Sequence, residues 1–312
     1  MSKIALSFKL ARWHYTPVII IPVVLGAALS WYQGHSFHWI GFLLCLVGAW
    51  FAHLGANAAN DCFDDVSGVD RIAHKWIPEN RGSTVCGSEI ITKGLMTRRQ
   101  GFFATSIFFL IAAACGAALF VDHGWPIAWF VAIGFVLGVF YCAAPIKFGY
   151  IGRGLGELGI LVAFGPLPVL GSYYVQTGSL SWSALIASLV PGLFTVSVLY
   201  NHHFSHASAD KQVGKMSPVV ALGMRGARKI TPAILAASYA ALVINVALGI
   251  FPPVSLIALL TAPIIFRAYF KLPRKESCDD SLNFLFNVVR TNITTGALVI
   301  AAIVITRLWV LP

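Results

Sequence analysis

Long apolar segments are the feature that most limits what this chain can fold into. Each is close to the roughly 20 residues that a helix needs to cross the hydrocarbon core of a bilayer. Helices satisfy their own backbone hydrogen bonds, as a bilayer requires. The sequence therefore predicts an all-α membrane protein with nine transmembrane helices. The nine segments lie near residues 16–32, 39–58, 102–121, 125–143, 155–175, 183–201, 231–250, 252–270 and 291–310.

Composition supports the same class, since 58% of the residues are hydrophobic and only 11% are charged, a balance that excludes an ordinary soluble domain. The first apolar segment follows three cations and resembles a signal peptide in that respect. It contains Pro17 and Pro22, however, and runs straight into a series of further spans. We interpret it as a retained helix.

The cations lie almost entirely on one side of the expected membrane. Of the 22 Lys and Arg residues, all except Arg307 precede the first segment or surround the connections that follow segments two, four, six and eight. The positive-inside rule therefore places the N-terminus and all long loops in the cytoplasm, as in a multi-pass protein of the bacterial inner membrane. The net charge of +10 then indicates contact with anionic lipid and a polyanionic substrate, and no nucleic acid.

A cluster of acids follows the second apolar segment. Acids at the edge of a bilayer need compensating cations, and an oxygen-only set of carboxylates and an amide suits Mg²⁺. On a continuing helix Asn60, Asp61 and Asp64 share one face, and Gly68 permits a turn that brings Asp70 back. The acids are Asp61, Asp64, Asp65 and Asp70.

A second polar group follows the sixth segment, and its matching position indicates a weak internal repeat. His206 and Asp210 are four residues apart, so on a helix they point to the same side and into a site shared with Asp64. A solvated loop with a structural aspartate is the alternative. The group comprises Asn201, His202, His203, His206, Asp210, Lys211 and Lys215.

The connection after the fourth segment is short and rich in glycine and aromatic residues. Lys147 and Arg153 stand where they can face the carboxylates. Glu157 falls just inside the membrane boundary, where an acid suggests function, although pairing with Arg153 four residues earlier is the alternative. Pro166 predicts a kink in the fifth segment, and such kinks often open a cavity.

The cysteines predict neither a disulfide nor a zinc site. None of the six has CxxC spacing, and most occur in or beside apolar segments, where a cysteine usually acts as a small buried hydrophobic residue.

Three motifs in order resemble the UbiA superfamily of membrane prenyltransferases. Asn60-Asp61-x-x-Asp64-x-x-x-Gly68-x-Asp70 is similar to the first aspartate motif of its menaquinone-type branch, and so are the segment Tyr150–Gly178 and the motif Asp210-Lys211-x-x-Gly214-Lys215. The similarity extends over most of residues 12–223. It implies one polytopic domain over residues 1–312, with a central cavity that opens to the cytoplasmic side and active-site loops at about 60–100, 144–154 and 202–229.

The resemblance implies Mg²⁺-dependent transfer of a polyprenyl group from polyprenyl diphosphate to an aromatic acceptor. The branch favours a dihydroxynaphthoate, with attachment at the carboxylated carbon and loss of CO₂, in menaquinone biosynthesis. It leaves open the 2- or the 6-carboxylate isomer. By this resemblance the catalytic residues are Asp64, Asp210, His206 and Lys147; the metal ligands Asn60, Asp61, Asp64, Asp70 and Asp210; the diphosphate contacts Arg81, Lys147, Arg153, Lys211 and Lys215; and the acceptor contacts Asn57, Tyr150, Glu157, Asn201 and His202.

Three positions depart from the family pattern. His206 stands where an aspartate is usual, and imidazole is a poor Mg²⁺ ligand beside carboxylate. His206 is therefore a metal ligand, a diphosphate contact or a base that acts on the acceptor hydroxyl. Glu89 and Ala221 stand where arginine is frequent.

Other functions were weighed against this one. A phosphatidyltransferase that uses CDP-alcohols requires an Asp-Gly-x-x-Ala-Arg signature, which the sequence lacks. A cation-coupled transporter predicts acids near the middle of the membrane, whereas here they lie at segment ends. Prenyl transfer to another aromatic or lipid acceptor also remains an alternative.

Overall fold

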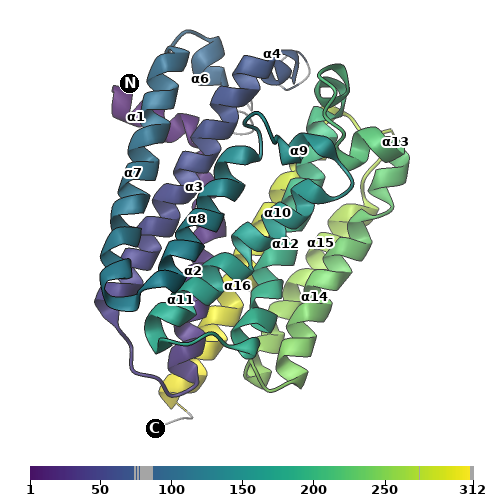
Figure 1. Cartoon of the computed structure of the whole chain (residues 1–312). Helices are drawn as coiled ribbons and strands as arrows, with labels where there is room; N and C mark the ends of the chain where they lie inside the picture. Colours follow the sequence, from purple (N-terminus) through teal and green to yellow (C-terminus); the bar gives the residue numbers. More distant parts are fainter. Residues whose placement is uncertain (74, 76, 78–86, 274, 310–312) are drawn as a thin grey trace.

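The protein is described here by a computed structural model that covers residues 1–73, 75, 77, 87–273 and 275–309. All regular structure in these residues is helical. The longer helices run side by side along one axis, and Figure 1 shows α1 and the end of α16 at opposite ends of the bundle. These helices are α2 (Pro17–Tyr32), α3 (Trp39–Ser67), α7 (Arg98–His123), α8 (Trp125–Phe140), α10 (Leu155–Phe164), α11 (Pro166–Thr177), α12 (Trp182–Gln212), α14 (Thr231–Ala247), α15 (Ala262–Phe270) and α16 (Cys278–Trp309).

The short helices gather at the N-terminal end of this bundle. Figure 1 places α1, α4, α6, α9 and α13 together at the top, where the chain makes its longer connections. Their bounds are Lys3–Leu10 for α1, Val69–Ala73 for α4, Glu89–Thr92 for α6, Phe148–Ile151 for α9 and Pro218–Arg228 for α13; two 3₁₀ segments, η1 (Trp13–Tyr15) and η3 (Pro253–Thr261), complete the set.

Seven helices or continuous helix pairs are long and apolar enough to cross a membrane, which makes the chain an integral multi-pass membrane protein. An eighth span results if α13 and α14 are counted as one, although the two are bent by 86°. Helix α8 is apolar but has only 16 residues. All nine predicted segments fall on helices, while the number nine itself stays a prediction.

Two helices extend well beyond their apolar segments. Helix α3 has 29 residues and α12 has 31, so each carries its polar group on the same rigid element as its membrane segment. Helix α3 ends where Gly68 adopts a φ of +79°, the left-handed cap that glycine provides without strain. The predicted turn at Gly68 is thereby confirmed, and Asp70 is the second residue of the next short helix, α4.

The kink predicted at Pro166 is present as a break between α10 and α11. Gly165 has non-helical backbone angles there. No Cβ fits at this position, because one would lie 2.7 Å from the carbonyl oxygens of Leu161 and Ser188 and 3.1 Å from the Cα of Gly192. The backbone of the fifth predicted segment therefore rests directly on α12, and Phe164 precedes this contact.

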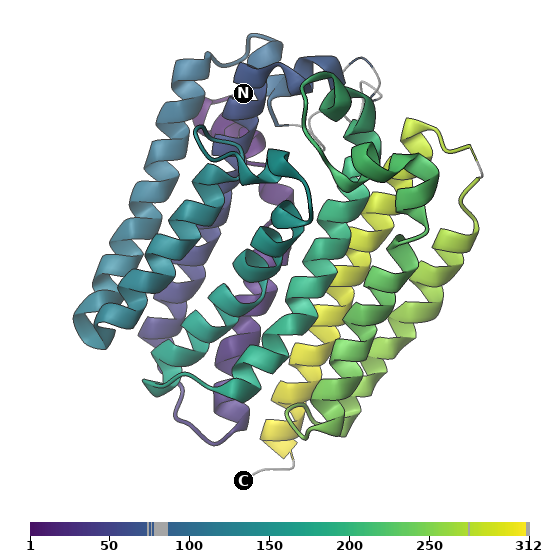
Figure 2. The same cartoon turned by 45° about the vertical axis from the view of Figure 1, so that its right-hand side comes forward.

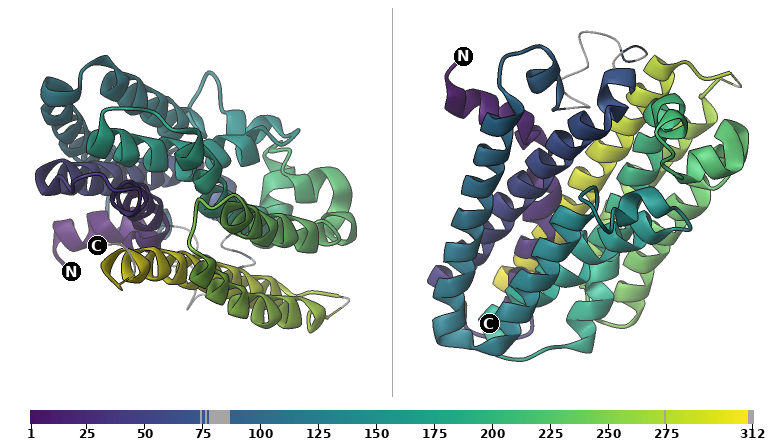
Figure 3. Two further views of the ribbon diagram at one scale, coloured as in Figure 1. Left: turned by 90° about the horizontal axis from the view of Figure 1, so that it is seen from below. Right: turned by 45° about the horizontal axis from the view of Figure 1, so that its top comes forward.

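Two groups of helices flank the middle of the bundle. Helices α3 and α7 lie side by side, and α12 lies against α14 and α16; the views in Figures 2 and 3 show these neighbours from other directions. The largest buried apolar cluster joins α2, α11, α12, α14 and α16 and includes Leu29, Phe194, Leu235 and Phe284. This cluster stabilises the half of the bundle that carries the second polar group.

Candidate active site

A cavity of about 840 Å³ extends along the inside of the bundle. At one end it is lined by Asp61, Asp64, Asp70 and Lys215, and further along it is lined by apolar side chains as far as Leu119. Helix α3 supplies one wall through residues four apart, which form a stripe on one side of the helix. The stripe consists of Leu44, Gly48, Ala52, Ala56, Asn60 and Asp64.

Two of the four acids on α3 and α4 have cationic partners. The guanidinium Nε of Arg12 lies 3.2 Å from Asp61 Oδ2. Asp65 is contacted by Arg98 at 2.7 Å and by Arg71 at 3.2 Å. Asp65 does not line the cavity, so this acid is fixed by its own ion pairs and serves the fold.

Asp64 and Asp70 have no cation in direct contact among the described residues. The hydroxyl of Tyr150 donates to Asp64 Oδ1 at 2.6 Å and also lies 3.2 Å from the hydroxyl of Ser67. Asp70 is 3% exposed, and no described residue donates to its Oδ2 atom. Burial, and after it the charge of Asp64, raises the pKa of Asp70 to about 7, because both effects penalise a second negative charge.

Asn60 lines the same end of the cavity and lies one helical turn before Asp64 on α3. Its Oδ1 atom accepts a hydrogen bond from the thiol of Cys142, which follows α8. A thiol is a weak hydrogen-bond donor, and here the Cys142 sulfur donates to the amide oxygen. The contact fixes the orientation of the Asn60 amide.

On α12, Asp210 is fully buried and touches two partners. Lys215 Nζ lies 3.6 Å from Asp210 Oδ1, and His203 Nδ1 lies 3.8 Å from Asp210 Oδ2. Burial alone lowers the pKa of Lys215, but the carboxylates of Asp210 and Asp64 outweigh it and hold that pKa well above its usual value. Lys215 is thus a permanent cation between the two acid groups.

His203 also connects α12 to α10. Its Nε2 atom lies 3.3 Å from Glu157 Oε1, so one imidazole bridges Glu157 and Asp210. The alternative partner of Glu157, Arg153, is exposed. Glu157 therefore reaches the second polar group across helices rather than along its own.

His202 and His206 stack on each other with ring centroids 4.3 Å apart, and both line the cavity. The Nδ1 atom of His206 lies 3.0 Å from the hydroxyl of Ser205. The two imidazoles therefore line the cavity as one aromatic pair.

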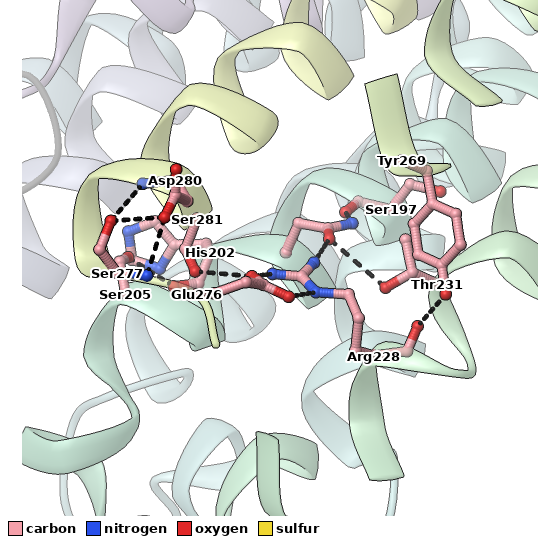
Figure 4. A network of polar contacts seen from close by, with 11 residues as sticks. Ser197, His202, Ser205, Arg228, Thr231, Tyr269, Glu276, Ser277, Asp280 and Ser281 are labelled. Carbon is pink, nitrogen blue, oxygen red and sulfur yellow. Dashed lines mark hydrogen bonds and ion pairs between the residues drawn. The ribbon is translucent and has the colours of Figure 1, made fainter. Parts of the chain in front are cut away.

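Behind α12, Arg228 holds the ends of several helices together (Figure 4). It donates to Asn201 Oδ1 at 2.7 Å and to Glu276 Oε1 at 2.8 Å, and its guanidinium carbon lies 3.5 Å from the ring centroid of Phe204. Tyr269 donates to the Arg228 carbonyl at 3.0 Å. Asn201 is occupied by this network and does not line the cavity.

The structure brings together most, but not all, of the predicted site residues. Tyr150 lies between the two groups, with Lys215 Nζ 5.1 Å and Lys147 Nζ 5.7 Å from its ring centroid. Arg153 and Lys211 are exposed and have no recorded contact with the carboxylates. Arg81 lies outside the described residues. The roles proposed for these residues stay predictions.

Sequence reasoning missed several contributors to this site. The sequence indicates for Arg12 only a cation on the cytoplasmic side, although Arg12 pairs with Asp61. For His203 it predicts no role beyond its place beside His202, and for Arg228 it predicts only a positive charge in a loop. A tight contact between residues 49 positions apart leaves no trace in local spacing, so a single sequence carries no signal for Arg12.

The carboxylate and amide oxygens of this site are chemically suited to Mg²⁺, but they do not converge on one metal position. No group of three or more His, Cys, Asp or Glu side chains among the described residues is arranged to hold a metal ion. Within the same residues, Asp70 Oδ2 and both carboxylate oxygens of Asp210 are buried and accept no hydrogen bond. Buried carboxylate oxygens normally have partners, so cations between these acids would satisfy them. The residues present fit oxygen-ligated Mg²⁺.

Comparison with known proteins identifies the fold and the family. The UbiA prenyltransferase family model matches residues 19–289. The chain belongs to the UbiA prenyltransferase family. Among its relatives, a 2-carboxy-1,4-naphthoquinone phytyltransferase of Synechocystis is 30% identical over 75% of this chain and 70% of the relative. A 1,4-dihydroxy-2-naphthoate octaprenyltransferase of Escherichia coli is 28% identical over 80% of this chain and 79% of the relative.

Solved structures of the UbiA family have the same fold. A UbiA homologue from Aeropyrum pernix without ligand aligns with a TM-score of 0.65 and 16% identity over 94% of this chain and 98% of that one. A homologue from Archaeoglobus fulgidus bound to GPP and Mg²⁺ aligns with a TM-score of 0.62 and 15% identity over 96% and 100%. The predicted family and the all-α fold are confirmed, and the chain is a prenyltransferase by family.

Proposed function

We propose that this enzyme transfers a polyprenyl group from a polyprenyl diphosphate to a dihydroxynaphthoate, with loss of CO₂, in menaquinone biosynthesis. One observation carries the proposal: a single cavity joins buried carboxylates and Lys215 at one end to a long apolar stretch at the other. A polyprenyl diphosphate has an anionic head and a long apolar tail, which match the polar and apolar ends of the cavity. The relatives named for naphthoate and naphthoquinone prenylation support the choice of acceptor.

Charge explains how the polar end assists departure of diphosphate. Mg²⁺ held by Asp64, Asp70 and Asp210, with Asp61 and Asn60 beside them, would offset the negative charge that develops on the leaving oxygens. Lys215 stands between the acid groups as a fixed cation and stabilises the same charge. Lys147 and Arg81 belong to the proposed diphosphate contacts, together with Arg153 and Lys211.

Bond formation follows at the acceptor ring. The allylic carbon loses its bond to the diphosphate oxygen and gains a bond to the ring carbon that bears the carboxylate. Release of CO₂ from that carbon restores the aromatic ring, so the step needs no oxidant and no net proton. Exclusion of water protects the allylic cation from hydrolysis, and the paired imidazoles of His202 and His206 would line the space that the acceptor enters.

The membrane arrangement belongs to the same proposal. Nine crossings would place α1 and the end of α16 on opposite sides of the membrane, and their positions at opposite ends of the bundle support this arrangement (Figure 1). The cation distribution directs the polar end toward the cytoplasm of a bacterial inner membrane. The cavity then receives its anionic substrates from the cytoplasm and its lipid tail from the bilayer.

Product mass spectrometry tests the proposal. Purified protein in detergent is incubated with a polyprenyl diphosphate, Mg²⁺ and either 1,4-dihydroxy-2-naphthoate or its 6-carboxylate isomer, with Asp64→Asn as the inactive control. We expect a prenylated, decarboxylated product that the control does not form. Diphosphate release that depends on Mg²⁺ without naphthoate prenylation would instead indicate another aromatic or lipid acceptor.

A further inference from the structure

A buried histidine in the cavity wall lies away from the carboxylates. His53 lines the cavity and is 7% exposed. It precedes Asp64 by 11 residues on α3, so it lies about 16 Å further along the helix axis. Asn57, Asn60 and Asp61 line the cavity in between. The polar part of the wall therefore continues well below the proposed diphosphate position before the lining becomes apolar.

The hydrogen bonds of Asn57 determine the tautomer of His53. The amide nitrogen of Asn57 lies 3.1 Å from the carbonyl oxygen of Ala11 and 3.1 Å from His53 Nε2. The Ala11 contact fixes the amide orientation, because the reverse orientation would place two oxygens against each other. An amide nitrogen only donates, so His53 Nε2 accepts and the neutral ring carries its hydrogen on Nδ1.

Two polar atoms in this wall are left without a hydrogen bond to any described residue, namely His53 Nδ1 and Asn57 Oδ1. Both residues line the cavity, so both atoms are available to a ligand there. One donor beside one acceptor matches a hydroxyl group, which accepts one hydrogen bond and donates another.

The surroundings of this pair favour an aromatic ligand. The ring of Phe164 meets the His53 imidazole edge to face, with centroids 5.6 Å apart. His202 lines the same cavity, and its Nε2 atom has no hydrogen-bond partner among the described residues. Arg12, which pairs with Asp61, lines the same cavity as the two histidines. Aromatic rings and a cation suit a planar hydroxylated acid.

We infer that His53, through Nδ1–H and together with Asn57, binds a phenolic hydroxyl of the aromatic acceptor at the end remote from the diphosphate. The inference rests on the proposed function, to which it adds a specificity-determining residue. With one hydroxyl held at His53, the rest of the ring extends toward the carboxylate end of the cavity. The ring carbon that forms the new bond then faces the allylic carbon.

Binding of acceptor analogues tests this assignment in the full-length protein in detergent. The probes are 1,4-dihydroxy-2-naphthoate and the two analogues that each lack one of its hydroxyls. The variants are His53→Phe, which removes the donor, and His53→Gln, which keeps an amide N–H. His38→Phe is the matched control, since His38 precedes the same helix and does not line the cavity.

We expect His53→Phe to weaken binding of the dihydroxy acceptor about tenfold, the range of one lost hydrogen bond to a ligand. His53→Gln should stay within about threefold of the wild type, and the KM for polyprenyl diphosphate should not change. Loss of one particular hydroxyl should weaken binding to the wild type but not to His53→Phe, because the two changes remove the same interaction. His53→Ala carries the same comparison if His53→Phe does not fold.

Equal losses for the hydroxyl deletion in wild type and variant would overturn the inference, and so would unchanged acceptor affinity in His53→Phe. Prenyl transfer by the same preparations reports separately on the proposed function. Acceptor binding that depends on His53 without any turnover would support the inference and reject the proposed reaction. Turnover with normal acceptor affinity in His53→Phe would support the proposed reaction and reject the inference about His53. A wild type that binds none of the probes would reject the inference outright.

Discussion

The polar ends of α3 and α12 occupy similar places but balance their charges differently. On the α3 side, four acids are present, and Asp61 and Asp65 are neutralised by arginines that come from other parts of the chain. On the α12 side, a single acid, Asp210, is surrounded by imidazoles and Lys215. The α3 end therefore has spare negative charge at Asp64 and Asp70, while the α12 end carries its cation within its own loop.

This difference separates two tasks, the binding of metal ions and the direct stabilisation of the leaving group. Spare carboxylates attract metal ions, and a built-in lysine stabilises a leaving group without one. Lys215 touches Asp210 and shares Tyr150 with Asp64 as a neighbour. The two ends are therefore expected to act on the same diphosphate from opposite sides, and substitutions on each side should have distinguishable effects.

The largest effect should come from removal of a metal-facing carboxylate. Asp64→Asn and Asp210→Asn should each lower kcat about 10³-fold or more, because metal charge is worth several kcal/mol in such a reaction. Mg²⁺ at 100 times its Kd should stabilise the wild type by about 2.7 kcal/mol. The same Mg²⁺ concentration should stabilise each variant by less than this. Thermal unfolding with and without EDTA measures the difference. Normal Mg²⁺ stabilisation of Asp210→Asn would restrict the metal to the α3 end.

The next effect concerns the cation. Lys215→Met should lower kcat about 10²-fold, since it removes one preorganised charge from the leaving group. Because nearby carboxylates hold the pKa of Lys215 well above its ordinary value, the wild-type rate should show no loss from Lys215 deprotonation as the pH rises through 8 and 9. Steady-state kinetics over that range provide the measurement, and a Lys215→Met rate near that of wild type would assign the cationic task elsewhere.

Asp65 and Asp70, five residues apart, should respond in opposite ways. Asp65→Asn should destabilise the protein by about 1–3 kcal/mol, the cost of weakening charge-assisted hydrogen bonds to Arg98, and leave the rate per folded molecule unchanged. Asp70→Asn should retain or raise thermal stability without Mg²⁺, because it removes a buried negative charge beside Asp64, and should lose activity. Thermal unfolding and specific activity of both variants decide the matter; equal behaviour would contradict it.

The smallest effect should come from the bridge between α10 and α12. Glu157→Gln and His203→Gln should each lower kcat/KM about three- to tenfold, the range of one hydrogen bond of about 0.5–1.5 kcal/mol. The double variant should lose less than the product of the two, because both changes break the same contact. Kinetics of the four proteins in a double-mutant cycle measure this, and fully multiplicative losses would indicate independent roles.

The sequence predicts positions well where the site residues belong to one helix or to the short loop that follows it. The spacing of Asn60, Asp61 and Asp64 places them on one side of α3, and all three line the cavity. Lys215, a predicted diphosphate contact in the loop after α12, lies 3.6 Å from Asp210. In these cases local helical geometry, or a short loop from a known helix end, determines the position of the side chain.

Prediction was weaker where tertiary contacts decide. Arg153 was expected near the carboxylates, but it sits in a left-handed turn with φ of +56° and is exposed. Asn201 was assigned to the acceptor because it begins the second polar group, yet Arg228 binds it behind the cavity. Partners such as Arg12 for Asp61 come from helices distant in sequence, and residue spacing contains no information about them.

The backbone contact between Gly165 and Gly192 has a consequence for how such an enzyme can be redesigned. No side chain fits at Gly165, so the neighbouring Phe164, which faces His53, is held at a depth that substitution of the glycines cannot adjust. The wall on α3 includes Ala52, which lines the cavity and is the position on that helix where a larger side chain should be tried. A library intended to change which molecules enter should therefore vary the α3 wall and leave the glycine pair untouched.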